Sequence, residues 1–331
     1  MEPVNVLILT SLGEESRQRI AGVSPRITVT DVADKLRAER KGDFSSKKEL
    51  DALLAEGEVL YGFRLPPGIL GRTPKLKWIQ TMSAGVEHFM TDEVKQNRAM
   101  VTNASGLHAG PIAEYILGQM LMFVKRSPFC FQFQQDQVWQ KVSPSVLRGK
   151  TLGIVGLGSI GRETARLAKA FGMRVLATRR SVKQTGKARN VDTLYPAKRL
   201  PELLAESDFV ALTLPFTPAT SKIIGEKELG TMKSGAFLIN IARGGVVDEE
   251  ALARALEEGW IAGAGLDVFA TEPLPAESRL WGLSNLVITP HISGGSDEDN
   301  TLGTTRIFVE NLKRYIEGRK LLNMVSKKHG Y

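Results

Sequence analysis

Cysteine is nearly absent from this 331-residue chain, which contains only Cys130. A single cysteine cannot form an internal disulfide, and this fits a reducing cytosol better than an oxidising compartment. Phe129 and Phe131 flank it, an environment that favours a buried, inert thiol over a nucleophile. We therefore expect a cytoplasmic protein whose chemistry does not use a thiol.

Long apolar runs are absent as well. The most apolar longer stretch, residues 115–124, is bracketed by Glu114 and Lys125. It is half as long as the roughly 20 residues that span a bilayer. Residues 1–10 carry Glu2 and Pro3 before a short apolar run, which is typical of a first strand rather than a secretory signal. The sequence thus predicts no membrane partner.

Charge of one sign is scarce in residues 172–200, where Asp192 is the only acid. The basic residues of this stretch are Arg174, Arg179, Arg180, Lys183, Lys187, Arg189, Lys198 and Arg199. The whole chain carries a net charge of +8. Tyr195 is the single aromatic residue of the stretch, too few for a base-stacking platform, and no nucleic-acid module is recognisable, so we expect no nucleic-acid partner. The stretch is either a solvated face or a local phosphate site.

Two domains are expected from the chain length, because one hydrophobic core rarely serves more than about 250–300 residues. Short apolar runs at residues 5–10, 58–61 and 76–80 alternate with helix-like stretches such as 45–56. A longer helix is predicted at 111–126, apolar almost all round and therefore buried on several sides. This alternation favours an open α/β sheet.

From residue 151 the alternation becomes sharper. Strands are predicted at 152–155, 174–177, 209–214, 237–241, 263–266 and 286–289. Helices are predicted at 160–171, 249–258 and 300–318, with a short helix around Leu203 and Leu204. These segments indicate a second parallel sheet.

A glycine motif of the form G-x-G-x-x-G follows the strand at 152–155 and precedes a helix. Its residues are Gly156, Leu157, Gly158, Ser159, Ile160 and Gly161. In this context the first glycine permits a sharp turn, the second lets a diphosphate approach the backbone, and the third lets helix and strand pack closely. The helix N-terminus offers N–H groups and a positive dipole end to the diphosphate. The motif predicts a dinucleotide site.

The acidic residue that normally ends the second strand of such a domain is missing. Thr178, Arg179, Arg180 and Ser181 stand there instead. No carboxylate is available to bind a ribose 2′-hydroxyl or to repel a 2′-phosphate, whereas guanidinium groups bind phosphate well. We predict that NADP(H) is preferred, with NAD(H) as the alternative cofactor if the two arginines are merely solvated.

Three polar residues each follow a predicted strand: Arg243, Glu272 and His291. The carboxyl ends of parallel strands meet at one edge of a sheet, where ligands bind in this architecture. A histidine can donate a proton to a ketone oxygen, a neighbouring carboxylate favours its protonated form, and a guanidinium matches the carboxylate of a 2-keto acid. Taken together, the three side chains predict a catalytic set.

These segments, residues 240–249, 266–273 and 289–295, together with the glycine motif resemble the D-isomer-specific 2-hydroxyacid dehydrogenase family. That family includes glyoxylate, hydroxypyruvate and phosphoglycerate dehydrogenases. Residues 83–87, 102–106 and 321–325 are similar to further family segments, so the resemblance covers nearly the whole chain. It implies two Rossmann-like α/β domains with parallel sheets, the cofactor domain inserted into the substrate domain, and an active site in the interdomain cleft.

The resemblance also implies domain bounds and roles. Residues 1–103 and 292–331 would form the substrate-binding domain, and 104–291 the dinucleotide-binding domain. Arg243 would anchor the carboxylate and carbonyl of the substrate, His291 would be the acid/base, and Glu272 its partner. Substrate contacts are further expected at Ala84, Gly85 and Val86. Additional cofactor contacts are expected at Leu214, Pro215, Thr220, Ile241, Ala242, Asp267 and Gly294.

The function implied is reduction of a small 2-keto acid to a D-2-hydroxy acid by a homodimer without a metal. Two alternatives stay open: a phosphite-type dehydrogenase on the same fold, and a non-catalytic dinucleotide-sensing protein. Formate dehydrogenase fits poorly, because it carries glutamine where Glu272 stands. For the other histidines, His88, His108 and His329, a structural or tail position is expected.

Overall fold

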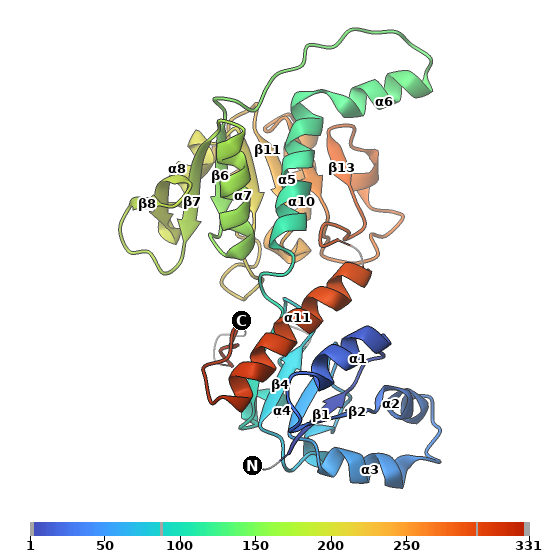
Figure 1. Cartoon of the computed structure of the whole chain (residues 1–331). Coiled ribbons are helices and arrows are strands. Elements are labelled where there is room, and N and C mark those ends of the chain that lie inside the picture. The colour runs from blue at the N-terminus through green and yellow to red at the C-terminus, as the bar shows by residue number, and fades with distance from the viewer. Residues whose placement is uncertain (1–2, 87–88, 296, 328–331) are drawn as a thin grey trace. The chain divides into compact units, whose positions relative to one another are not determined.

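The computed structural model describes residues 3–86, 89–295 and 297–327. The chain divides into two compact units, Met1–Leu107 with Ser296–Tyr331, and His108–Gly295. Each unit contains a parallel sheet between helices (Figure 1), so the predicted α/β class is confirmed. The observed bounds lie four residues from the predicted ones. No helix among the described residues is long and apolar enough to cross a membrane.

The smaller sheet lies in the first unit and has the strand order β2-β1-β3-β4-β5, all parallel. Its strands are β1 (Val4–Ile8), β2 (Ile27–Asp31), β3 (Val59–Gly62), β4 (Trp78–Thr81) and β5 (Met100–Thr102). Helices α1 (Glu14–Ala21) and α11 (Asp297–Ile316) pack on one face. Helices α2 (Ala33–Arg40), α3 (Lys47–Ala55) and α4 (Asp92–Gln96) cover the other.

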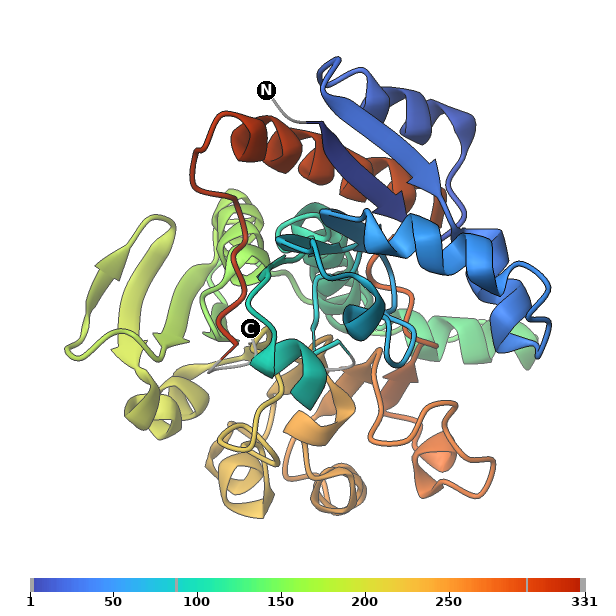
Figure 2. The same ribbon diagram turned by 90° about the horizontal axis from the view of Figure 1, so that it is seen from below.

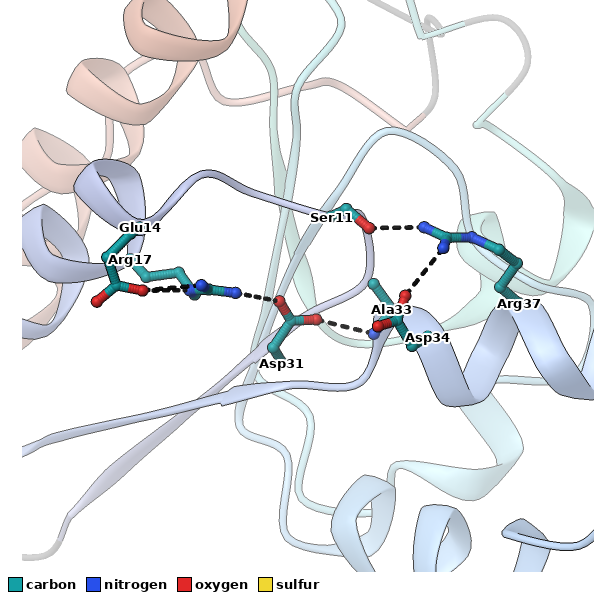
Figure 3. Close-up of polar contacts among 7 residues, drawn as sticks. All are labelled: Ser11, Glu14, Arg17, Asp31, Ala33, Asp34 and Arg37. Carbon is teal, nitrogen blue, oxygen red and sulfur yellow. Dashed lines mark hydrogen bonds and ion pairs between the residues drawn. The ribbon is translucent and has the colours of Figure 1, made fainter.

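Asp31 ties together the elements that flank β2 (Figure 3). One of its oxygens accepts the Ala33 N–H at 3.0 Å at the start of α2, and the other pairs with Arg17 of α1 at 3.2 Å. Arg37 in turn contacts Asp34 and the Ser11 hydroxyl. Because these side chains are largely solvated, the ion pairs add little to stability. This corner is local scaffolding.

The larger sheet lies in the second unit, in the order β13-β12-β11-β10-β6-β7-β9-β8. Its strands are β6 (Thr151–Val155), β7 (Arg174–Arg179), β8 (Gly186–Ala188), β9 (Val191–Pro196), β10 (Phe209–Leu212), β11 (Phe237–Asn240), β12 (Gly263–Leu266) and β13 (Leu286–Ile288). All neighbours are parallel except β8 and β9. The β8–β9 hairpin, the yellow-green edge in Figure 2, lies within the basic stretch and was not predicted.

Helices cover both faces of the larger sheet. On one face lie α5 (Ala109–Val124) and α7 (Ser159–Ala170), and on the other lie α8 (Leu200–Glu206), α9 (Glu226–Thr231) and α10 (Glu249–Glu257). The central strands β6, β10, β11 and β12 are buried along their whole length, as expected for a sheet covered on both faces. The sheet is therefore a rigid base for the loops at its carboxyl edge.

Helix α5 leads into α6 (Ser127–Gln135), which lies beyond the end of α5 in Figure 1 and contains no buried residue. The prediction of a buried Cys130 was wrong, because this cysteine lies on α6 and is exposed. The flanking phenylalanines misled the sequence argument, since Phe129 and Phe131 are themselves 42% and 55% exposed.

Candidate active site

The glycine motif forms a tight turn between β6 and α7. Gly156 has φ +103°, and its N–H and that of Leu157 both donate to the Thr178 carbonyl. A Cβ on Gly161 would lie 2.5 Å from the Gly156 carbonyl oxygen, so no larger residue fits there. Gly158 is the N-cap of α7, and a Cβ added to it would meet nothing within 4 Å. The turn and the open helix N-terminus fit a bound diphosphate.

The end of β7 presents its basic residues to solvent. Arg179, Arg180 and Ser181 are exposed, whereas Thr178 is buried with only 4% of its surface accessible. The backbone carbonyl of Thr178 also fixes the glycine turn. The three exposed residues are therefore the groups at this strand end that can meet a phosphate.

The loop after β10 packs against the glycine turn. Thr213 Oγ1 donates to the Gly156 carbonyl at 2.6 Å, and the Leu214 Cβ would lie 2.9 Å from a Cβ on Gly156. Further along, Thr220 Oγ1 donates to the Pro215 carbonyl at 2.8 Å and closes the loop on itself. Strands β6 and β10 are neighbours, so this loop borders the dinucleotide turn.

Arg243 follows β11 in a turn that Asn240 closes. The Asn240 Oδ1 accepts the Ala242 N–H and its Nδ2 donates to the Arg243 carbonyl, both at 3.0 Å. Ile241 and Ala242 are buried while Arg243 is half-buried, and its Nη1 donates to the Ala242 carbonyl at 2.7 Å. The turn thus holds the guanidinium at the carboxyl edge of the sheet.

Gly244 allows the loop after β12 to approach the Arg243 turn closely. A Cβ at this position would lie 1.8 Å from the Phe269 carbonyl carbon. The loops after β11 and β12 are therefore in backbone contact, and only glycine is compatible with that approach. Arg243 and the Glu272 loop are brought together by this packing.

Glu272 and His291 form a direct pair across the loops after β12 and β13. The His291 Nδ1 lies 2.8 Å from the Glu272 Oε2, and the Glu272 Oε1 accepts the Phe269 N–H at 2.9 Å. The histidine side chain is 52% exposed and the glutamate 37%. The carboxylate orients the ring, and Nε2 is the nitrogen that the Glu272 contact leaves available for chemistry.

Asp267 supports this pair through hydrogen bonds to residues that flank His291. It is fully buried, and its Oδ1 accepts the Thr289 hydroxyl at 2.6 Å and the Ile292 N–H at 2.9 Å. Its Oδ2 accepts the Ser293 N–H at 2.9 Å. Residues on both sides of His291 are therefore bound to one carboxylate, through a side-chain hydroxyl before it and two backbone N–H groups after it. Sequence reasoning did not assign this structural role to Asp267.

The remaining predicted residues lie in separate settings. Ala84, in the first unit, accepts a 2.7 Å hydrogen bond from the Asn103 Nδ2 through its carbonyl, which fixes the loop after β4 that also holds Gly85 and Val86. Gly294 lies near the ring of His108, the residue at the N-cap position of α5. His88 and His329 lie outside the described residues. The loop-closing asparagines were missed; their sequence signal is an Asn that directly ends or follows a strand.

Comparison with known proteins decides the family. Residues 117–293 match the model of the D-isomer specific 2-hydroxyacid dehydrogenase NAD binding domain. Glyoxylate reductase from Thermococcus litoralis is 37% identical over 293 residues, which cover 85% of each chain. This chain belongs to the D-isomer specific 2-hydroxyacid dehydrogenase family. It is an NAD(P)-dependent oxidoreductase, as the resemblance in its motifs predicted.

Other relatives of this dehydrogenase agree. Glyoxylate reductase from Pyrococcus horikoshii is 35% identical over 290 residues, 82% of this chain and 84% of the relative. The structure of a family member from Xanthobacter autotrophicus Py2 with NADPH and MES has a TM-score of 0.83 at 28% identity and full coverage of both chains. An NADPH-dependent glyoxylate/hydroxypyruvate reductase from Sinorhizobium meliloti, bound to NADP and sulfate, has a TM-score of 0.83 at 25% identity, covering 99% of this chain and all of the other.

Proposed function

We propose that this dehydrogenase reduces a small 2-keto acid of the glyoxylate or hydroxypyruvate type to the D-2-hydroxy acid, and that it prefers NADP(H). The observation that carries the proposal is the Glu272–His291 pair beside the Arg243 loop, at the ends of three adjacent strands. The relatives named glyoxylate reductase support the substrate class. The substrate contacts of Ala84, Gly85 and Val86 stay a prediction.

The proposed chemistry assigns a task to each side chain. When bound, the nicotinamide supplies the hydride that the carbonyl carbon receives. The Arg243 guanidinium binds the planar carboxylate of the keto acid and polarises its carbonyl. Protonated His291 donates a proton from Nε2 to the carbonyl oxygen, while Glu272 holds Nδ1 and stabilises the imidazolium. In the oxidative direction, neutral His291 accepts the hydroxyl proton at the same nitrogen.

The cofactor preference rests on the end of β7. Arg179 and Arg180 are exposed there, Ser181 follows them, and no carboxylate precedes or follows them within the segment 174–191. Two guanidinium groups favour a 2′-phosphate over a 2′-hydroxyl. The proposed cofactor site also contains the glycine turn and the residues Leu214, Pro215, Thr220, Ile241, Ala242, Asp267 and Gly294.

Parallel initial-rate measurements test the proposal. Glyoxylate, hydroxypyruvate, pyruvate and phenylpyruvate are each reduced with NADPH and with NADH. We expect the highest kcat/KM with NADPH as the cofactor and either glyoxylate or hydroxypyruvate as the keto acid. Faster turnover with NADH overturns the cofactor preference alone. Cofactor binding without turnover of any keto acid supports the sensor instead, and turnover of phosphite supports the phosphite-type dehydrogenase.

The assembly is a separate expectation. The resemblance that predicts the enzyme class also predicts a homodimer. Sedimentation equilibrium at micromolar concentration measures this directly, and a monomer mass would contradict it.

A further inference from the structure

A chain of hydrogen-bonded side chains, called the file below, runs within the second unit from Gln119 on helix α5 to Asp267 beside the His291 loop. The Gln119 Nε2 lies 2.8 Å from the Tyr115 hydroxyl, which lies 2.5 Å from the Thr289 Oγ1, which lies 2.6 Å from the Asp267 Oδ1. The proposed mechanism uses Asp267 only as a cofactor contact and does not use the other three. Gln119 and Tyr115 lie on α5, a helix that is otherwise mostly apolar.

The protons in this file have one consistent direction. A carboxylate only accepts, so the Thr289 hydroxyl donates its single proton to Asp267. The Tyr115 hydroxyl must then donate to Thr289, and the Gln119 amide donates to Tyr115. Each donor is thereby polarised toward the buried negative charge, an arrangement in which neighbouring hydrogen bonds strengthen one another.

The file ends at the backbone that sets the position of His291. His291 has φ +57°, a left-handed conformation that costs a non-glycine residue free energy. It is held by Thr289 on one side and by the Ile292 and Ser293 N–H groups on the other, all attached to Asp267. A loss of donors to Asp267 or Thr289 therefore loosens the one turn that aims the imidazole.

The α5 end of the file is fitted to the sheet. Gln119 is only 4% exposed, and a Cβ added to Gly265 on β12 would lie 2.8 Å from its Oε1. Glycine at this strand position leaves the room that Gln119 occupies. Burial raises the pKa of the Tyr115 hydroxyl above its ordinary value, and the nearby Asp267 charge adds to this, so Tyr115 remains a protonated donor.

We propose that Tyr115 is a positioning residue for the proton donor of this enzyme, acting on His291 through Thr289 and Asp267 and held in place by Gln119. The inference rests on the proposed role of His291. A residue of α5, which covers a face of the sheet, would thus help to align the His291 imidazole at the edge of the sheet.

The first test is Tyr115→Phe in the full-length enzyme with glyoxylate and NADPH. We expect kcat to fall about fivefold to tenfold, the size of effect that the loss of one buried hydrogen bond produces, with both KM values changed less than twofold. Tyr61→Phe is the matched control, because the buried Tyr61 hydroxyl in the first unit donates to the Thr304 hydroxyl at 3.2 Å. It should lower stability without lowering kcat.

A double-mutant cycle separates positioning from general destabilisation. In a Thr289→Val background the connection is already cut, so Tyr115→Phe should lower kcat by less than twofold. An undiminished effect there would show that Tyr115 does not act through Thr289, and an unchanged kcat in the single Tyr115→Phe variant would overturn the inference outright.

Amide hydrogen exchange gives a readout independent of turnover. The Ile292 and Ser293 N–H groups should exchange about tenfold faster in Tyr115→Phe than in the parent and no faster in Tyr61→Phe. Gly265→Ala, which displaces the flexible end of Gln119 rather than backbone, should give a smaller change in the same direction. Faster exchange in a protein that reduces no keto acid would refute the proposed function but retain the positioning role; unchanged exchange refutes the positioning role.

Discussion

The two edges of the larger sheet each rely on an aspartate that accepts backbone N–H groups, but their surroundings differ. At the amino edge, the Asp208 Oδ2 accepts the Thr151 N–H at 2.7 Å and its Oδ1 pairs with Lys233 at 2.9 Å, with 28% of the side chain exposed. At the carboxyl edge, Asp267 is fully buried and accepts only hydroxyl and N–H groups among its described contacts.

The difference shows how one fold separates stability from function. A half-solvated aspartate with a lysine partner holds two strands in register and tolerates its charge easily. A buried aspartate without a cation has to be satisfied entirely by oriented donors, and those donors belong to the turn around His291. Several hydrogen bonds to Asp267 fix the turn where proton transfer is proposed. At Asp208, where only strand pairing is needed, a lysine balances the charge.

The largest expected effect is at the carboxyl edge itself. His291→Ala should lower kcat for glyoxylate reduction by about 10²- to 10⁴-fold, the range that general acid catalysis contributes. Because the pair with Glu272 is partly exposed, the variant should fold with an unchanged circular dichroism spectrum. Single-turnover rates in stopped flow measure the effect, and a loss below tenfold would exclude His291 as the proton donor.

Asp267→Asn is the sharper test of the buried aspartate. The amide presents an N–H group where only donors face it, leaving at least one buried donor unpaired at a cost of about 1–3 kcal/mol. We expect kcat to fall about 10- to 100-fold, together with a lower thermal midpoint. If kcat keeps its parent value while the midpoint falls, the carboxyl-edge aspartate is as purely structural as Asp208.

Arg179→Ala with Arg180→Ala should change cofactor selectivity by a smaller factor. Removing both guanidiniums should raise the KM for NADPH about tenfold and leave that for NADH within twofold, because only the 2′-phosphate loses a contact. Lys187→Ala, elsewhere in the basic stretch, is the control for net charge. Equal changes for both cofactors would mean that the end of β7 does not read the 2′-phosphate.

The smallest effect is expected at the amino edge. Burial tends to raise the pKa of Asp208, but the Thr151 N–H and Lys233 together hold it below its usual value. Asp208→Asn should therefore lower the free energy of unfolding by about 1 kcal/mol at pH 7 with kcat unchanged.

The pH dependence of that loss has a definite sign. A carboxyl whose pKa is lower in the folded protein contributes stability above its unfolded pKa, and the contribution disappears as pH falls through the folded value. Urea titrations at pH 7 and pH 3 should show the parent and Asp208→Asn converging at the acid end. A gap that widens on acidification would contradict the shift.

Much of this fold was predictable because parallel strands and a glycine turn leave strong local signals. The strand before Gly156 and the helix after it were located to within a few residues, since apolar runs and glycines report backbone demands directly. The β8–β9 hairpin was missed because β8 has only three residues and is largely exposed, so it leaves no apolar pattern. Cys130 was misplaced because aromatic neighbours in sequence do not bury a residue, and α6 contains no buried residue.

The sequence by itself determined the family, the dinucleotide turn and the three residues at the strand ends, since each is a local pattern read at fixed spacing. Only the tertiary structure decided that Glu272 meets the Nδ1 of His291, that Asp267 binds residues on both sides of that histidine, and that Tyr115 reaches Thr289. These contacts join residues up to 174 positions apart. No local pattern encodes them, because they arise where the sheet order and the packing of α5 bring separate loops together.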